Sequence, residues 1–522
     1  MLSPTLMAST GRRAALIWLV RVLAILLGAR TLLLAARYLL GAPNVPRYQV
    51  ESSVVAFVVL GALAHATRAR DATETLQARS RVVTASRPAL LAVELVGWCA
   101  ASLALYWPAL RIGFLSDDWT LVDRVRHGAM GWVHSEFFRP LPLLVWSVLL
   151  RLDGPLAAHL LNVLAHGLVA FLAAHLVAPF AASPLTVLAA GALVLTFPAS
   201  VEAVTWASGV FDVTATCLVL LAVLISRRYV DRPRWSTRVA LMAIAVSALL
   251  CKETALVVQA LVAVDAWASR RLIRPLVIDL LVLGVVFAAV GLVRWLLASE
   301  TVRQPVTRYL LQRWLFGTVG GLAVPWHEAV IASWPWVPIA GVIIVMSLAT
   351  MFVVTRSRAG VSRPLVASAV WLLAGSLPAL TFFFVARDLQ GSRYLYMPAV
   401  GYATLLVTMA AGTANPALKK CGGIGLGVLV LLGVVGVRTH QPYWQNAART
   451  RDAVLMAARS DERLRRCGTV SLQGLPDTVF GAYVFRNGAA LALSDVAGVT
   501  LSEGAVPPCV FSWDTAGGFC QP

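Results

Sequence analysis

Two adjacent carboxylates, Asp117 and Asp118, follow an apolar run in the segment Gly113–Trp119. Charged groups are costly beside lipid, so ionisable residues in such a place suggest a function. A carboxylate there could act as a general base that takes the proton of an attacking hydroxyl. The alternative is a helix N-cap formed by Ser116 or Asp117. Neighbouring side chains on a helix point about 100° apart, so the two carboxylates need not share one task.

A second group of polar residues has helical spacing. His159, Asn162 and His166 are three and four positions apart, which places them on one face of a single apolar helix. A polar stripe in a membrane helix faces protein or a wet cavity. The residues therefore allow two interpretations, a substrate site or hydrogen bonds that only join helices.

Further ionisable residues lie at the ends of apolar runs. The candidates for substrate binding among them are Arg139, Glu202, Lys252, Glu253, Arg393 and Tyr394. Lys252 and Glu253 could also form a mutual ion pair. Their positions predict that cations and carboxylates from distant parts of the chain converge on one side of a membrane, as an active site there would need.

The elements that carry these residues are membrane helices. The chain has 522 residues, of which 59% are hydrophobic and 13% charged, whereas soluble domains are about half apolar and about a quarter charged. Apolar runs of roughly 18 to 25 residues match about 30 Å of hydrocarbon. The sequence predicts an all-α polytopic protein with about 13 spans. They are expected at 15–40, 50–66, 89–110, 157–178, 184–198, 203–226, 237–251, 254–269, 273–297, 337–355, 364–386, 394–411 and 422–438.

The net charge of +19 does not indicate nucleic acid here, because the basic residues sit in short loops that set membrane topology. With these spans every basic loop falls on one side, which is expected to be the cytoplasm. The N-terminus is then cytoplasmic and the C-terminus extracytoplasmic. The Ala-, Leu- and Arg-rich composition leads us to expect a bacterial plasma membrane.

Three regions are predicted: two N-terminal helices with a basic loop (1–88), a membrane core (89–438) and a small extracytoplasmic α+β domain (439–522). The core has long external loops at 111–156 and 298–336, and the second loop contains an interfacial helix near 309–325. Three cysteines fall in the C-terminal region, Cys467, Cys509 and Cys520, and would face an oxidising compartment. A Cys509–Cys520 bridge is one arrangement, but three cysteines leave one over, so the pairing stays open.

Six short motifs follow one another along the chain. In order they are Phe114–Trp119, Phe138–Leu141, His159 to His166, Phe197-Pro198 with Val201–Val204, Cys251–Glu253 and Arg393–Pro398. Together they resemble the GT-C glycosyltransferases, and in particular the protein O-mannosyltransferase relatives whose membrane core is followed by tetratricopeptide repeats. The resemblance spans about 89–410, but this chain has two extra helices before the core and lacks the repeats.

The resemblance implies transfer of a sugar from a polyprenyl-phosphate carrier to an acceptor on the external face. Asp117 would be the general base of an inverting displacement, with Asp118 as a second catalytic candidate. Arg139, Lys252 and Arg393 would hold the lipid phosphate. Glu202 and the histidine stripe would orient sugar or acceptor. No closed metal-ligand set is visible, so no metal or other cofactor is predicted, and the acceptor could be protein, glycan or lipid.

Two other classes of protein fit parts of the sequence. A transporter or flippase of a lipid-linked or small anionic substrate would explain buried polar residues, but should show paired broken helices and inverted repeats. A membrane scaffold that presents the C-terminal domain would explain that domain but not the converging charges.

Overall fold

The computed structural model describes residues 88–127, 139–180, 183–297, 305–354, 362–467, 469–501, 509–514 and 518–520. The spans expected at 15–40 and 50–66 lie outside these residues. The α-helices are α3 (Pro88–Tyr106), α4 (Asp117–Arg126), α5 (Pro140–Leu149), α6 (Gly154–Val177), α7 (Pro184–Leu195), α8 (Val201–Thr205), α9 (Val210–Asp231), α10 (Trp235–Cys251), α11 (Val258–Ala268), α12 (Arg274–Leu297), α13 (Arg308–Ala323), α14 (Glu328–Ser333), α15 (Trp336–Val354), α16 (Ser362–Ala374), α17 (Tyr396–Gly412), α18 (Pro416–Ser460), α19 (Glu462–Cys467) and α20 (Ala489–Ala497).

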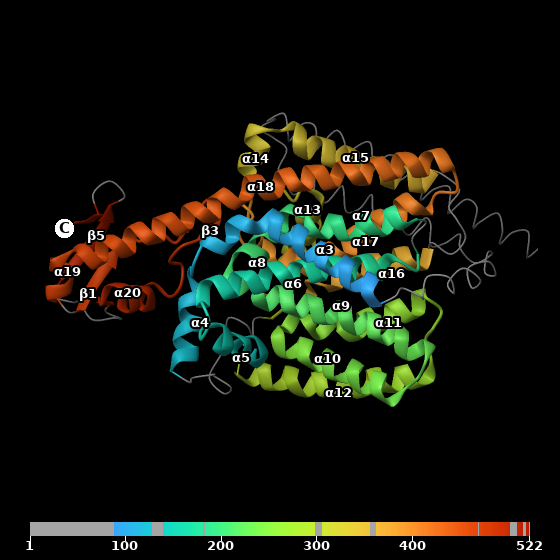
Figure 1. Ribbon diagram of the computed structural model, residues 1–522, viewed down its shortest axis with the longest axis horizontal. Helices are drawn as coiled ribbons and strands as arrows, with labels where there is room; N and C mark the ends of the chain where they lie inside the picture. The colour runs from blue at the N-terminus through green and yellow to red at the C-terminus, as the bar shows by residue number, and fades with distance from the viewer. Residues whose placement is uncertain are drawn as a thin grey trace, which may run out of the picture.

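Most of these helices form one bundle with a common long axis (Figure 1). Within the described residues, seven helices are long and apolar enough to cross a membrane, or eight if the bent pair α7–α8 is one span. The protein is therefore a multi-pass helical membrane protein. The expected count of about 13 spans is not confirmed. Several expected spans are shorter or interrupted, since α10 has 17 residues, α11 has 11 and α16 has 13.

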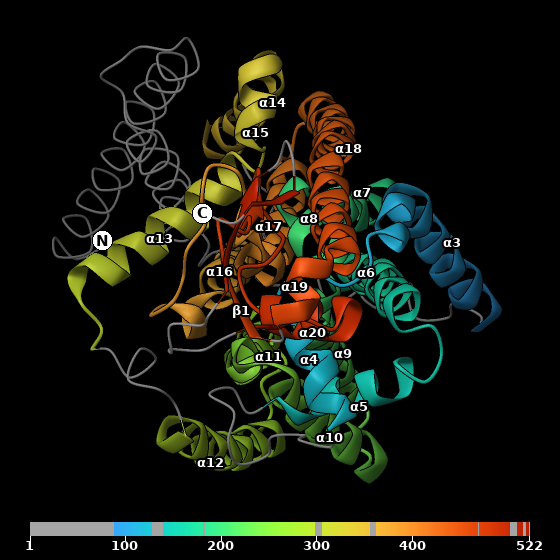
Figure 2. The same cartoon turned by 90° about the vertical axis from the view of Figure 1, so that its left-hand side faces the viewer.

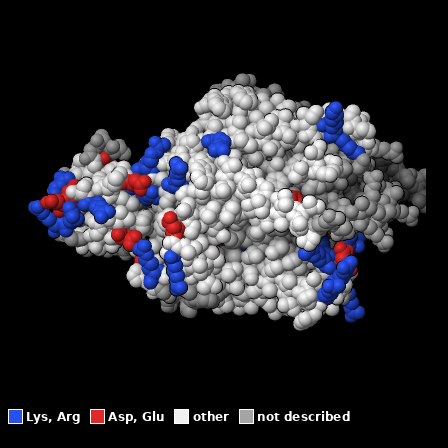
Figure 3. Space-filling model, viewed as in Figure 1, with Lys and Arg blue, Asp and Glu red and all other residues white. Residues whose placement is uncertain are grey.

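The buried centre of the bundle includes α6, α9 and α17. In the most apolar stretch of Ser392–Gly412, which contains α17, 89% of the residues are buried inside the protein, against 17% for Pro88–Arg111. Side chains in the second stretch therefore face outward, where a membrane would cover them. On the face seen in Figure 3 the middle of the bundle is mostly uncharged, and most Lys, Arg, Asp and Glu side chains lie toward its two ends.

The helices break at one end of the bundle, and these breaks carry ionisable residues. The chain from α7 to α9 passes through a short 3-10 turn, η2 (Pro198–Ser200), then α8 and η3 (Ala207–Gly209). The α7 and α8 segments meet at a bend of 47°. Two further 3-10 turns, η4 (Glu253–Val257) and η6 (Ser392–Leu395), precede α11 and α17.

The longest helix, α18, carries the chain out of the bundle to a separate C-terminal unit (Figure 1). Its 45 residues would extend about 68 Å at about 1.5 Å per residue, twice what a bilayer core needs. The helix continues past residue 438, where the sequence placed the end of a span. We call residues 461–522 the tail domain, and the end of the bundle beside it the tail end.

The tail domain contains a small mixed sheet, which confirms the expected C-terminal strand region. Its order is β4-β1-β5-β6, with β1 parallel to both neighbours and β6 antiparallel to β5. A separate hairpin pairs β2 with β3. The strands are β1 (Thr469–Gln473), β2 (Thr478–Val479), β3 (Ala482–Tyr483), β4 (Thr500–Leu501), β5 (Val510–Asp514) and β6 (Gly518–Cys520).

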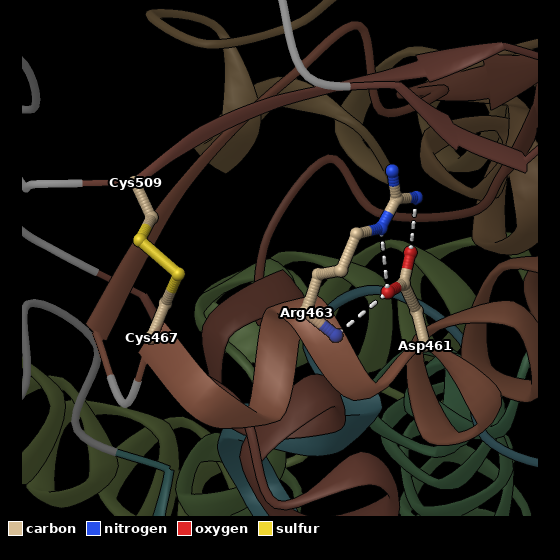
Figure 4. The surroundings of a disulfide bond; sticks show 4 residues. All are labelled: Asp461, Arg463, Cys467 and Cys509. Atoms are coloured by element: carbon tan, nitrogen blue, oxygen red, sulfur yellow. Dashed lines mark hydrogen bonds and ion pairs between the residues drawn. A yellow bond between two sulfur atoms is a disulfide. The ribbon is translucent and has the colours of Figure 1, made fainter.

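A disulfide closes the tail domain between Cys467 and Cys509 (Figure 4). The bridge joins the end of α19 to the residue before β5, and an ion pair between Arg463 and Asp461 lies nearby. The Cys509–Cys520 pairing is therefore wrong. Cys520 ends β6, which pairs with the far part of β5 from Ser512 to Asp514, and its thiol is free.

Candidate active site

The two adjacent carboxylates begin α4 at the tail end. Asp117 and Asp118 occupy the first turn of this helix, where the exposed backbone N–H groups favour negative charge. Ser116 precedes them with φ of +47°, in the left-handed region, and its side chain does not cap the helix. The simple N-cap interpretation therefore fails for Ser116.

Asp118 is completely buried and joins the start of α4 to η3. One oxygen accepts a hydrogen bond from the backbone N–H of Leu115 at 2.8 Å. The other accepts from the backbone N–H of Ser208 at 2.8 Å and from the Ser208 hydroxyl. Burial raises the pKa of the Asp118 carboxyl to about 7, although the bonds from Ser208 and Leu115 oppose this. A carboxyl enclosed in this way positions the loop and has no open side for an acceptor.

Asp117 has a different environment from its neighbour. Its side chain is partly exposed, and its Oδ1 accepts a hydrogen bond from the Asn487 amide at 2.6 Å and a longer one from Ser116 at 3.5 Å. Among the described residues both of these contacts end on Oδ1, and no ion pair engages Asp117. Oδ2 is thus available to take a proton.

Three ion pairs lie at the breaks of the helices, and together we call them the tail-end cluster. Each joins segments that are distant in sequence or lie on different helices. The pairs are Arg139–Glu253, with bonds of 2.6 and 2.9 Å, Lys252–Asp212 at 2.5 Å and Arg393–Glu202 at 2.9 Å. The charges of Asp212, Arg139, Glu253 and Arg393 all act on the Lys252 ammonium, so the three pairs form one electrostatic unit.

Lys252 and Glu253 do not pair with each other. Lys252 has extended backbone angles, φ −160° and ψ 148°, and in extended backbone successive side chains point to opposite sides. Lys252 therefore reaches Asp212 on α9, while Glu253 reaches Arg139 before α5. The mutual ion pair considered from the sequence is wrong for this reason.

Aromatic rings line the cations of the tail-end cluster. The Arg393 guanidinium lies over the rings of Trp206, Tyr394 and Tyr483 at 4.8, 5.3 and 5.7 Å, and Lys252 lies 5.2 Å from the Tyr394 ring. Rings that face a cation attract it electrostatically and shield it from water. Arg393 keeps 20% of its side chain exposed, whereas Lys252 keeps 3%. Arg393 is thus the more accessible of the two to a ligand.

Trp206 and the tail domain connect the cluster with the Asp117 loop. The Trp206 indole N–H donates to the carbonyl of Leu115 at 3.1 Å while its ring lies under Arg393. Tyr483 of the tail domain donates to Glu202 at 3.4 Å, and the next residue, Val484, accepts from the Ser116 N–H at 2.9 Å. The tail-end cluster and the loop before Asp117 are therefore contacted by the same residues.

The polar stripe of α6 contacts protein groups. His159 Nε2 donates to the carbonyl of Gly113 at 3.0 Å, and Asn162 donates to the carbonyls of Trp206 and Ala207. His166 Nε2 donates to Leu195, so its Nδ1 accepts from the Tyr396 hydroxyl at 2.6 Å. All three side chains are buried. This geometry fits the interpretation in which the stripe forms hydrogen bonds that join helices. Through His159 it also holds the loop before Asp117.

The structure adds site residues that no sequence motif identified. Arg451 on α18 donates to the carbonyls of Ile112 and Phe114 at 2.8 and 2.7 Å and so holds the loop from the other side. Asp212 and Ser208 complete the contacts of Lys252 and Asp118. Tyr483 and Asn487 come from the tail domain, where the sequence predicted a small α+β domain and no site residue. Within the described part of the chain, no three His, Cys, Asp or Glu side chains converge as metal ligands do.

Part of the chain is similar to Protein O-mannosyl-transferase Tmtc1 of Drosophila melanogaster. The two are 32% identical over 190 residues, which covers 31% of this chain and 21% of the fly protein. The chain thus spans about a fifth of the length of the curated relative it matches. No family model matches the chain.

Proposed function

We propose that the protein is a membrane glycosyltransferase that moves a sugar from a polyprenyl-phosphate carrier to an acceptor hydroxyl. The observation that carries the proposal is Asp117, a partly exposed carboxylate without an ion pair among the described residues, beside a cluster of one buried and two partly buried cations. A chain segment similar to a protein O-mannosyl-transferase and the multi-pass helical bundle support the same class of enzyme. GT-C architecture and inverting stereochemistry belong to this proposal.

The chemistry follows from the two halves of the site. Asp117 Oδ2 accepts the proton of the acceptor hydroxyl while the oxygen of that hydroxyl forms a bond to the anomeric carbon of the sugar. The bond from that carbon to the phosphate oxygen breaks on the opposite face, and polyprenyl phosphate leaves with the electron pair. The negative charge on this leaving group needs a cationic, water-poor environment.

Arg393 and Arg139 are best placed to supply that environment. A guanidinium has five N–H donors, and the ion pair of Arg393 with Glu202 uses one of them. Arg393 can therefore keep its carboxylate partner, which holds it in place, and still bind a phosphate oxygen. Lys252 is almost fully buried against Asp212, so in this proposal it acts through the field of the cluster.

A transporter is the rival hypothesis, and the helix geometry weighs against it. A secondary transporter of the inverted-repeat type needs two corresponding broken helices. Among the described residues one helix pair, α7–α8, bends sharply within a span. In addition, His159, Asn162 and His166 of the α6 stripe each form a hydrogen bond with a protein group.

Sugar transfer by the purified protein tests the proposal. The full chain in nanodiscs is given labelled polyprenyl-phosphate-mannose and a Ser/Thr-rich acceptor peptide, and both peptide labelling and donor hydrolysis are measured. We expect Asp117→Asn to reduce transfer by about 10³-fold, since general base catalysis contributes about 10²- to 10⁴-fold. Donor binding should stay within about twofold of the wild type, because Asp117 does not touch the phosphate.

Asp123→Asn is the matched control, because Asp123 lies on the same helix but is paired with His127 on the surface. That variant should keep full activity. Wild-type protein that binds no donor and transfers no sugar, tested with mannose and glucose carriers, contradicts the proposal. Flux of the carrier across the membrane without any transfer would favour the transporter instead.

A further inference from the structure

The C-terminal domain contributes a residue to this site. We infer that Asn487 is a positioning residue that orients Asp117, so that the site is incomplete without the tail domain. The inference rests on the proposed function, because it takes Asp117 as the base. Its support is a set of contacts that Val484, Asn487 and Gly488 make with the start of α4, and a close approach of Gly481 to the loop before η6.

The backbone of the tail holds Ser116 in its unusual conformation. A non-glycine residue in the left-handed region is strained by about 1 to 3 kcal/mol and persists only where its surroundings fix it. Ser116 donates its N–H to the carbonyl of Val484 at 2.9 Å, and its hydroxyl oxygen accepts from the N–H of Asn487 at 3.2 Å. The tail thus fixes the residue that directly precedes Asp117.

Two glycines of the tail domain allow its backbone to approach the bundle closely. Gly488 has φ of +75°, and a Cβ there would lie 2.7 Å from the carbonyl oxygen of Ser116. Gly481, at the turn of the β2–β3 hairpin, has φ of +81°, and a Cβ would lie 2.4 Å from the carbonyl oxygen of Asp388. Contacts this close are typical of a defined docking position and not of a loose surface encounter. Viewed from the tail end, the domain lies in front of the bundle above α4 (Figure 2).

The Asn487 side chain then acts on the carboxylate itself. Its amide N–H donates to Asp117 Oδ1 at 2.6 Å, a charge-assisted hydrogen bond of the stronger kind. This bond engages Oδ1, so it restricts the rotation of the carboxylate and leaves Oδ2 to take the proton. A base that is held in its reactive orientation reacts faster than one that rotates freely. A misplacement of about 1 Å can lower the rate by about 10²-fold.

Substitutions at Asn487 test the inference in the full-length protein in nanodiscs, with the same donor and peptide. Asn487→Ala removes the donor and should lower kcat about tenfold, with the donor KM within twofold of the wild type. Asn487→Asp keeps the shape but replaces the N–H donor by a second carboxyl group. Two carboxyl groups at this distance share one proton, so we expect about a 100-fold loss at pH 7 and partial recovery at higher pH as that proton leaves.

Asn446→Asp is the matched control for the change of amide to carboxyl. The Asn446 side chain is also on the tail side of α18, but its oxygen accepts a hydrogen bond from Arg449 at 2.6 Å. A carboxylate keeps that bond, so this variant should match the wild type in kcat, in donor KM and in pH profile.

The outcomes separate the two proposals. An inactive Asp117→Asn together with Asn487 variants within twofold of the wild type overturns the inference and leaves the proposed function standing. Equal loss of donor binding, thermal stability and kcat in Asn487→Ala assigns Asn487 a purely structural role, which also overturns it. An active Asp117→Asn contradicts the base assigned in the proposed function, whatever the Asn487 variants do.

Discussion

Ion pairs lie at both ends of the helical bundle, but they connect different parts of the chain. At the end away from the tail domain the partners are 38, 41 and 40 residues apart, and they join segments close in the chain order. These pairs are Arg227–Asp265, Arg238–Asp279 and Arg271–Asp231. In the tail-end cluster the partners of Arg139–Glu253, Lys252–Asp212 and Arg393–Glu202 are 114, 40 and 191 residues apart.

The difference shows which pairs the topology alone explains. A charge at the end of one helix meets the start of a nearby helix wherever a short loop turns the chain, so pairs about 40 residues apart, Lys252–Asp212 at the tail end included, accompany the fold. Glu202 and Arg393 meet only because α8, which follows the bend after α7, and the 3-10 turn that begins the span Ser392–Gly412 are brought together at the tail end. Buried ionic groups are costly to assemble, and a cluster built from such distant segments is therefore the better candidate for a function.

The difference between the two ends is tested most strongly by replacing the arginine of one pair at each end. Arg393 and Arg227 each hold a carboxylate and lie over an aromatic ring, Arg227 over Phe180 at 5.5 Å. Arg393→Lys keeps the charge for Glu202 but loses the planar fork and its stacking. We expect about a 30-fold or greater fall in kcat/KM for sugar transfer, with the fold retained.

Arg227→Lys makes the same chemical change at the other end and should leave transfer within twofold of the wild type. Initial rates of both variants, with protein folding checked by size-exclusion chromatography, make the comparison. Equal losses in the two variants would show that the tail-end cluster has no special role.

The next effect concerns Asp118, a buried carboxyl at the tail end that has hydrogen bonds in place of a cation. Its pKa is about 7 in the folded protein, against an ordinary value of 3.8. Between these values the folded protein keeps a proton that the unfolded chain releases. This contribution to stability is complete below pH 3.8 and falls as the pH rises through 7, by up to about 4 kcal/mol.

Asp118→Asn removes this dependence and also leaves one N–H donor of Leu115 or Ser208 without an acceptor, at a cost of about 1 to 3 kcal/mol. The variant should unfold at a lower temperature than the wild type, and the gap should be larger at pH 5 than at pH 8. Thermal unfolding in detergent at the two pH values measures it. A gap that does not change with pH would contradict the assignment of the proton to Asp118.

The sequence predicted a multi-pass helical protein, although not the number of its spans, and it predicted ionisable residues at helix ends, because both depend on local composition. It could not identify which residues pair. The spacing of His159, Asn162 and His166 is the same for a helix that lines a cavity and for one that packs on protein, and only the positions of Gly113, Trp206 and Leu195 distinguish the two. The spacing therefore predicted the shared face of α6 and not its partners.

No local sequence pattern could have predicted that the tail domain contributes residues to the site. Asn487 reaches Asp117 across 370 residues of chain, and the contact depends on the length of α18 and on the turn at Phe480 and Gly481. In a sequence, only a glycine indicates that a residue at such a turn has a positive φ. The Cys467–Cys509 bridge could not be assigned for a similar reason, since three cysteines allow three pairings.

A smaller effect on transfer is expected from opening that disulfide. It closes a loop of 42 residues, and constraining the unfolded chain in this way stabilises a domain by about 4 kcal/mol. The double variant Cys467→Ser/Cys509→Ser should loosen the tail domain and lower transfer severalfold, while Arg227–Asp265 and the rest of the other end stay unaffected. Cys520→Ser changes a free, exposed thiol and should behave as the wild type. Full transfer by the double variant at 37 °C would show that tail stability does not limit the site.

The smallest effect tests whether charge holds the tail domain on α4. Arg126 on α4 pairs with Asp495 on α20 at 2.5 Å, but their side chains are 54% and 38% exposed. An exposed pair of this kind contributes about 0 to 1 kcal/mol and weakens in salt. Asp495→Asn should therefore change transfer by less than twofold at physiological salt, in contrast to the tenfold loss expected for Asn487→Ala a few residues away. A loss of more than twofold from Asp495→Asn that grows at low ionic strength and disappears at high salt would mean that surface charge, and not the contacts of Val484 and Gly488, docks the tail on the site.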